Sequence, residues 1–75
     1  MNAQEMKQKV ERLTRIKNRY LVQADSAMTD YRNNRDAAPS YAAACYEEAH
    51  GLYRAADAIQ ERIYAIQERI MQELS

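Results

Sequence analysis

The fold is decided by residues 33–40, which read Asn33-Asn34-Arg35-Asp36-Ala37-Ala38-Pro39-Ser40. The chain has one proline and one glycine, so this stretch gathers most of its helix-breaking residues. Asparagine tolerates the left-handed backbone conformation that ends many helices. Asp36 or Ser40 can cap a following helix, and Pro39 suits the first turn of that helix. Because proline disfavours helical angles in the residue before it, the sequence predicts a turn at residues 34–39.

The residues that follow this turn carry a helical apolar repeat. Their apolar positions are spaced alternately four and three residues apart, which is the spacing of a coiled-coil seam. Segment 59–70, IQERIYAIQERI, repeats the letters IQERI after seven residues, so the heptad is visible as repeated sequence. We expect a helix over about residues 40–74. Its seam residues are Cys45, Ala49, Leu52, Ala56, Ile59, Ile63, Ile66 and Ile70.

The residues before the turn follow the same alternation, and we expect a helix over about residues 2–33. Lys17 is the single polar break in this seam. Three apolar residues beside the seam, Ile16, Leu21 and Met28, widen the stripe towards the three-in-seven face of a bundle helix. The seam residues are Met6, Val10, Leu13, Lys17, Tyr20, Ala24, Ala27 and Tyr31.

A short turn makes two such helices antiparallel neighbours. Charge favours this direction, because residues 1–35 carry eight basic and four acidic side chains, whereas residues 36–75 carry three basic and seven acidic ones. Large seam residues come level near the termini and small ones near the turn: Val10 and Leu13 with Ile59 and Ile63, and Ala24 and Ala27 with Cys45 and Ala49. The sequence therefore predicts an all-α fold, a coiled-coil-like antiparallel two-helix hairpin forming one domain over residues 1–75.

Gly51 is the weak point of the second predicted helix. A glycine inside a helix costs about 1 kcal/mol relative to alanine. A kink at Gly51, or a break that yields three helices, is therefore the alternative to an unbroken second helix.

The small size of the chain predicts that it associates. A domain of 75 residues buries a smaller share of its surface than a larger one, so its stability is marginal without support. Cys45 is the only cysteine, which excludes an intrachain disulfide, and His50 is the only histidine, so one chain cannot build a tetrahedral zinc site from these residue types. We expect a homodimer in which two hairpins form a four-helix bundle.

No apolar run approaches the roughly 20 residues of a membrane-spanning helix. The opening residues, MNAQEMKQK, lack the apolar core of a signal peptide. We therefore expect a cytoplasmic protein in a reducing compartment, with no membrane partner.

Two features resemble catalytic or metal-binding groups. Glu47-x-x-His50 has the spacing of the Glu-x-x-His pair in di-iron carboxylate bundles, but both residues fall outside the seam, where a solvated surface pair is the simpler interpretation. Cys45 lies in the seam among alanines and is interpreted as a small buried apolar residue. The chain has no glycine-rich phosphate loop and no evident Ser/His/Asp set. We expect no enzymatic activity, metal, cofactor or small-molecule substrate.

Six tyrosines stand out in a chain without phenylalanine or tryptophan. Tyr46 and Tyr53 are one heptad apart beside the seam, and tyrosine is over-represented at buried interface centres. Two interpretations remain open: the rings cover a partner, or they fill space left by the alanines inside one hairpin. The predicted interface residues are Ile16, Tyr20, Leu21, Met28, Tyr46, Tyr53 and Tyr64.

Basic residues of the first helix are candidates for contact with a phosphate backbone. They are Lys9, Arg12, Arg15 and Arg19. The alternative is a solvated helix face. A formal net charge of zero is far from the basic balance of most nucleic-acid-binding domains, so nucleic acid is a possible but not the favoured partner.

Two segments resemble known families. Residues 45–59, CYEEAHGLYRAADAI, are similar to the plasmid copy-number regulator Rop, and this resemblance implies a dimeric four-helix bundle that binds RNA through its first helices. Pro39-Ser40-Tyr41 followed by AAAC resembles the small co-chaperones of type III secretion needle subunits, which are also helical hairpins.

The favoured functional hypothesis is a protein–protein interaction module, an adaptor, chaperone or inhibitor, acting through an apolar and tyrosine-bearing helix face. Its partner is a second copy, another protein, or both. The alternatives are a Rop-like regulator that binds RNA or DNA through the first helix and a hairpin like the needle co-chaperones.

Overall fold

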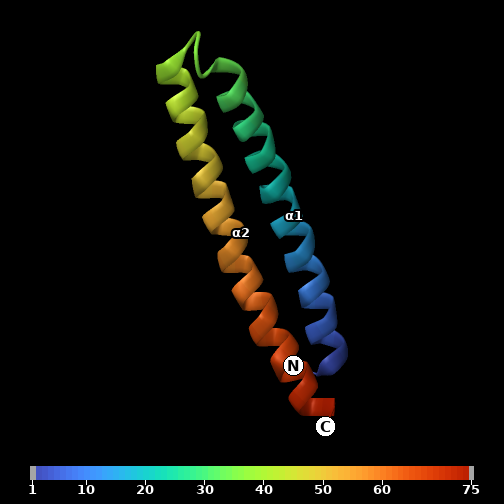
Figure 1. Cartoon of the computed structure of the whole chain (residues 1–75). Coiled ribbons are helices and arrows are strands. Elements are labelled where there is room, and N and C mark those ends of the chain that lie inside the picture. Colours follow the sequence, from blue (N-terminus) through green and yellow to red (C-terminus); the bar gives the residue numbers. More distant parts are fainter. Residues whose placement is uncertain (1, 75) are drawn as a thin grey trace.

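The computed structural model describes residues 2–74 as two long helices, α1 (Ala3–Asn34) and α2 (Pro39–Leu74). They lie side by side with the turn at one end and the chain termini at the other (Figure 1). We call these the turn end and the open end. The prediction of an all-α helical hairpin is confirmed. Residues 1 and 75 of the predicted domain lie outside the described residues. No helix within residues 2–74 is long and apolar enough to cross a membrane.

Helix α2 continues unbroken through Gly51, so the three-helix alternative is wrong. The glycine has a helical neighbourhood on both sides within a helix of 36 residues. Its cost of about 1 kcal/mol is small compared with the stabilisation that a long helix gains from packing through its seam.

The helix ends are set by local hydrogen bonds. At the start of α1 the Asn2 side-chain Oδ1 accepts from the Glu5 backbone N–H at 2.8 Å, which is an N-cap. At its end the Asn34 side-chain Nδ2 donates to the Asp30 carbonyl at 2.8 Å, and the Ala38 N–H donates to the Asn34 carbonyl at 2.8 Å. The Glu5 N–H and the Asn34 carbonyl are groups that a helix end would otherwise leave unpaired.

Two expectations about the turn are wrong in detail. No residue in the described chain has a positive φ, so the asparagines do not end α1 in the left-handed conformation. Pro39 is the first residue of α2, one residue before the expected start, so Ala38 precedes the helix and Ser40 already lies inside it. Asp36 and Ser40 therefore do not occupy the capping position. The proline itself supplies the helix start, because its φ is already suited to a first turn.

The core is a single seam between the two helices. Every predicted seam position is buried or half-buried, including Lys17. The Lys17 Nζ donates to the Gln60 side-chain Oε1 at 2.6 Å, which gives the charged group of the seam a hydrogen-bond partner. The buried residues are Met6, Leu13, Ala24 and Ala27 of α1 and Ala42, Cys45, Ala49, Ala56 and Ile63 of α2.

Contacts between the helices fix an antiparallel register. As the residue number rises along α1, the number of its partner in α2 falls. The contacts that define this register are Lys17 with Gln60, Asp25 with Tyr53, and Tyr31 with Tyr46. By this register Leu13 lies level with Ile63 and Ala27 lies level with Ala49, so large residues meet near the open end and small ones near the turn end.

The hairpin is only two helices thick, with Cα extents of 57 × 14 × 14 Å. Residues just outside the seam therefore line one of two long edges where α1 and α2 meet solvent. We call one the aromatic edge, which includes Leu21, Met28, Tyr46 and Tyr53. We call the other the charged edge, which includes Asp30, Glu48, Arg62 and Arg69.

Candidate functional site

A cluster of aromatic rings spans the two helices on the aromatic edge near the turn. The Tyr31 and Tyr46 ring centroids are 5.2 Å apart across the helix pair. The His50 ring lies 4.3 Å from Tyr46 and 6.3 Å from Tyr53, all within α2. The Tyr53 hydroxyl donates to the Asp25 Oδ1 of α1 at 2.7 Å. The cluster therefore joins α1 to α2 on both sides of His50.

The small seam of this half explains why the rings gather there. Ala24 and Ala49 are 0% exposed, and Cys45 is also buried. Such short side chains fill little of the width between two helices. Half-buried Tyr31 and Tyr53 extend the contact outwards, where a longer side chain is needed to reach the opposite helix. Part of the tyrosine set thus serves the hairpin itself.

Five of the seven predicted interface residues lie on or beside the aromatic edge. Leu21, Met28 and Tyr53 are half-buried there. Tyr46 and Tyr64 are 43% and 63% exposed. These five apolar or aromatic side chains lie outside the seam and form part of the surface of the hairpin.

The other two predicted interface residues do not belong to that surface. Tyr20 lies in the seam and is half-buried against α2. Ile16 is 39% exposed, but it precedes a seam residue, whereas Leu21 follows one, so Ile16 lies on the charged edge. Sequence reasoning missed Met71 and Leu74, which are 71% and 67% exposed and continue the aromatic edge to the open end. Their heptad spacing from Tyr64 and Tyr53 is the signal that predicts this placement.

The Tyr53 hydrogen bond predicts a measurable dependence of stability on pH. The bond to Asp25, aided by burial and by the negative charge of Asp25, raises the pKa of Tyr53, while Arg32 opposes the shift. A raised pKa means that folding favours the neutral phenol. Its stabilisation is therefore fully present below about pH 10 and is lost as the pH rises through the pKa of the folded state.

We expect Tyr53→Phe to make the alkaline loss of stability less steep. Urea unfolding at several alkaline pH values, together with the ultraviolet absorbance titration of the tyrosines, measures this. Tyr64→Phe removes an exposed phenol and is the matched control, which should keep the wild-type slope. Equal slopes for Tyr53→Phe and the wild type would contradict the hydrogen bond.

Cys45 is buried in the seam next to the turn end. The Cys45 side chain raises the pKa of the Tyr41 hydroxyl, and the charges of Asp30 and Glu48 together with burial act in the same direction. Glu47 and His50, which share the spacing of a metal-binding pair, are both exposed. Within residues 2–74 no three His, Cys, Asp or Glu side chains lie close enough to hold a metal ion together.

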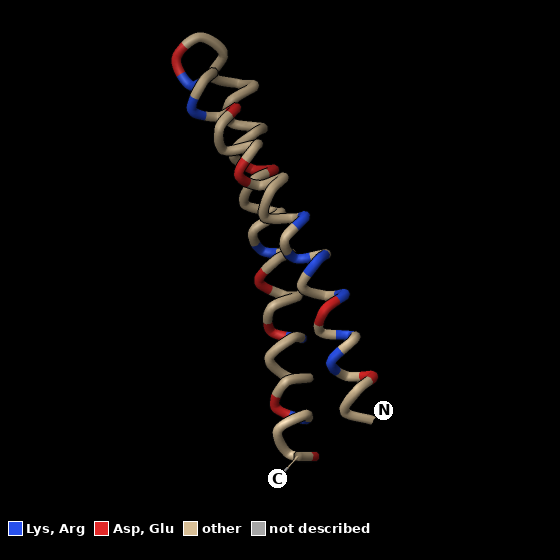
Figure 2. Tube along the Cα trace, turned by 90° about the vertical axis from the view of Figure 1, so that its right-hand side faces the viewer, with Lys and Arg blue, Asp and Glu red and all other residues tan. Residues whose placement is uncertain are grey.

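Basic side chains gather towards the open end, where blue segments follow α1 in Figure 2. Arg12, Arg15 and Arg19 are exposed and Lys9 is half-buried. Helix α2 adds Arg62 and Arg69, which sequence reasoning missed. Both occupy the same place in the repeated IQERI segment, directly before a seam isoleucine. That heptad position places them on the charged edge, beside the α1 residues Lys9 and Ile16.

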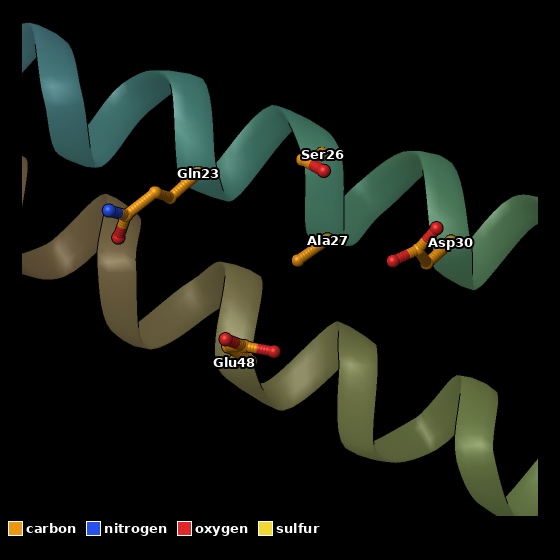
Figure 3. A pocket seen from close by; sticks show the side chains of 5 residues that line it. All are labelled: Gln23, Ser26, Ala27, Asp30 and Glu48. Atoms are coloured by element: carbon orange, nitrogen blue, oxygen red, sulfur yellow. The ribbon is translucent and has the colours of Figure 1, made fainter.

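The turn end of the charged edge is acidic. An open hollow of about 230 Å³ lies between the helices there, lined by Gln23, Ser26, Ala27, Asp30 and Glu48. In Figure 3 the Asp30 carboxylate lies on the side of α1 that faces α2, and the Glu48 side chain lies against the α2 ribbon. The charged edge thus changes sign along its length, from acidic near the turn to basic near the open end.

Comparison with known proteins gives no relative. No protein family, curated protein or solved structure matches the chain.

Proposed function

We propose that this chain is a non-enzymatic protein–protein interaction module whose aromatic edge binds an amphipathic helix of a partner protein. The observation that carries this proposal is the row of apolar and aromatic side chains outside the seam. Leu21 and Met28 of α1 flank this edge from one side, and Tyr46 and Tyr53 of α2 flank it from the other. None of the four belongs to the seam, although Tyr46 and Tyr53 also contact α1.

The arrangement of these side chains along the hairpin suits a third helix. An amphipathic helix that packs along the aromatic edge presents apolar anchors at every third or fourth residue, which is a common mode of peptide recognition. Tyrosine contributes a large apolar face and a polar hydroxyl, so it is stable both in contact with water and when covered. The aromatic edge can therefore be exposed to water in the free protein and covered by a helix in the complex.

The aromatic cluster is already ordered before any partner arrives. The Tyr53 hydroxyl is held by Asp25, and the Tyr46 ring rests against Tyr31 and His50. Binding to side chains that are already in place costs less conformational entropy than binding to mobile ones. This supports the turn-proximal part of the edge as the anchoring region.

Met28→Lys should weaken partner binding without unfolding the hairpin. The lysine places a charge at the centre of the aromatic edge, where a partner helix would cover it, yet its long stem can reach solvent in the free protein. We expect at least about a tenfold loss of affinity, as for a central interface residue. The measurement is affinity capture from host lysate, followed by titration of the captured protein.

Val22→Lys is the matched control, because Val22 is 70% exposed on the outer side of α1. A partner that the wild type and Val22→Lys capture, and Met28→Lys does not, supports the proposal. Equal capture by all three proteins would reject the aromatic edge as the binding surface. Truncating Tyr46 and Tyr53 is a less clean test, because both rings also join the two helices.

A further inference from the structure

The charged edge of α2 carries a pattern that is complementary to itself. Four larger side chains on this edge are Tyr41, Glu48, Arg62 and Arg69, and all four are exposed. Glu48 precedes Ala55 by seven residues and Arg62 follows it by seven. Tyr41 precedes Ala55 by fourteen residues and Arg69 follows it by fourteen. Reversing the helix about Ala55 therefore exchanges an acid for a base and a tyrosine for an arginine.

The residues between these four are small. Ala44, Gly51, Ala58 and Ala65 are exposed along the same side of α2. A Cβ atom built on Gly51 meets nothing within 4 Å, so no part of the hairpin packs against the glycine in a way that requires the side chain to be absent. A glycine lets another backbone approach closely. Reversal about Ala55 also sets Gly51 opposite position 59 and Ala44 opposite position 66, so Gly51 comes within one residue of Ala58 and Ala44 within one residue of Ala65.

We propose that a second copy of this chain docks on the charged edge, with the two α2 helices antiparallel and Ala55 at the two-fold axis. Each Glu48 then faces Arg62 of the other copy, and each Tyr41 faces Arg69 of the other copy. The first contact is an ion pair and the second places a guanidinium against an aromatic ring. Both contacts occur twice, as two-fold symmetry requires.

Helix α1 has the same polarity and favours the same direction. Asp30 shares the acidic hollow with Glu48 at the turn end, whereas Lys9, Arg12 and Arg19 lie towards the open end. An antiparallel second copy sets the acidic hollow of one hairpin beside the basic end of the other. A parallel copy would place like charges together, which is unfavourable.

The size of the edge is sufficient for a stable contact. A standard interface buries about 800 Å² on each partner, which is roughly one seventh of the 5474 Å² surface of this hairpin. One long side of a body that is 57 Å long and 14 Å wide supplies an area of that order. The small residues let the helices approach closely along this length.

This inference goes beyond the proposed function. The aromatic edge lies on the opposite side of each hairpin, so it remains uncovered in the dimer. Each dimer then presents two aromatic edges and binds two partner helices. Such bivalence raises the apparent affinity for a partner that itself carries two sites.

Charge reversal tests the predicted pairs. Glu48→Arg and Arg62→Glu should each turn both ion pairs of the dimer into like-charge contacts and raise the dissociation constant at least about tenfold. The double variant, Glu48→Arg with Arg62→Glu, should return to within about threefold of the wild type, because it exchanges the partners. Sedimentation equilibrium over a range of concentrations at low salt measures all four proteins.

Mixing the two single variants gives a sharper outcome. In a mixed dimer the arginine introduced by Glu48→Arg in one chain would face the glutamate introduced by Arg62→Glu in the other. The native Arg62 of the first chain and the native Glu48 of the second would also face each other, so both contacts are attractive. The equimolar mixture should therefore dimerise although neither variant does so alone. Glu47→Arg and Arg54→Glu change the same charges at exposed positions outside both edges, and they should dimerise like the wild type.

Three results would overturn the dimer. The first is a wild-type monomer throughout the concentration range. The second is a dimer that Met28→Lys disrupts and the charge reversals do not, which would move the second copy to the aromatic edge. The third is a wild-type monomer that shifts a labelled RNA in a gel when Arg62→Glu does not, which would make the edge a nucleic-acid surface. Capture of another protein through the aromatic edge is independent of all three, so the proposed function can stand if the dimer fails.

Discussion

Leu13→Asp and Ile63→Asp are each expected to unfold the hairpin at about neutral pH. The two side chains are 7% and 3% exposed and lie level with each other across the seam. An aspartate at either position loses the apolar contact and buries a charge that has no partner. Leaving a charge buried and unpaired costs about 3–5 kcal/mol. A domain of this length has a total stability of only about 4–11 kcal/mol.

Far-UV circular dichroism and thermal unfolding measure this effect. Val22→Asp is the control, because it introduces the same residue into α1 at a position that is 70% exposed. We expect the control to keep its helicity and to unfold within a few degrees of the wild type. If Leu13→Asp behaved like Val22→Asp, the assignment of the seam would be wrong.

The seam was predictable from the sequence because a heptad repeat leaves few alternatives. Alternating spacings of four and three place one side of a helix in contact with its neighbour over many turns. A slip of one residue would expose Ile63 or Leu13, so each added heptad strengthens the same assignment. The single breaker cluster then fixes where the chain reverses. Helix α1 begins and ends one residue later than the expected range, and α2 begins one residue earlier.

Local details of the turn were not predictable, because several arrangements have similar free energies. An asparagine at a helix end can adopt a left-handed backbone or can use its side chain. In this chain Asn34 uses its side chain, donating to Asp30. The cost of Gly51 is small beside the packing of a helix with 36 residues, so the sequence alone did not decide between a break and continuity.

The candidate site was predicted only in part, because its two edges depend on the partner helix. In a single helix Ile16 and Leu21 look equivalent, since each flanks a seam residue. Ile16 precedes Lys17, whereas Leu21 follows Tyr20, and an antiparallel neighbour places these two positions on opposite edges. The same reasoning places Arg62 and Arg69 of α2 on one edge with Lys9 of α1. The sequence of a single helix does not reveal this, because it depends on the register between the two helices.

The proposed function depends on the close approach of the helices near the turn. Ala24 and Ala49 are fully buried, and side chains this short let the two helices approach closely. This closeness lets Tyr53 reach Asp25 and lets Tyr31 reach Tyr46. The aromatic edge is therefore a consequence of the small residues beneath it, and a change in the seam should alter the edge.

Ala49→Leu is expected to destabilise the hairpin and to weaken partner binding at the same time. Overpacking of a filled core costs about 1–3 kcal/mol, and here it also pushes apart the helices that the aromatic cluster joins. The midpoint of urea unfolding reports the first effect. Titration of the captured partner reports the second. We expect an affinity loss of about tenfold, because the aromatic edge would be wider and its rings less ordered.

Ala43→Leu is the matched control for this prediction. It makes the same substitution in α2 at an exposed position, so helix propensity and added volume are equal in the two variants. It should unfold at the wild-type urea concentration within error. If Ala49→Leu matched this control in stability, the helices would not be in close contact at this level. If it were destabilised but bound the partner normally, partner binding would not depend on the close approach of the helices.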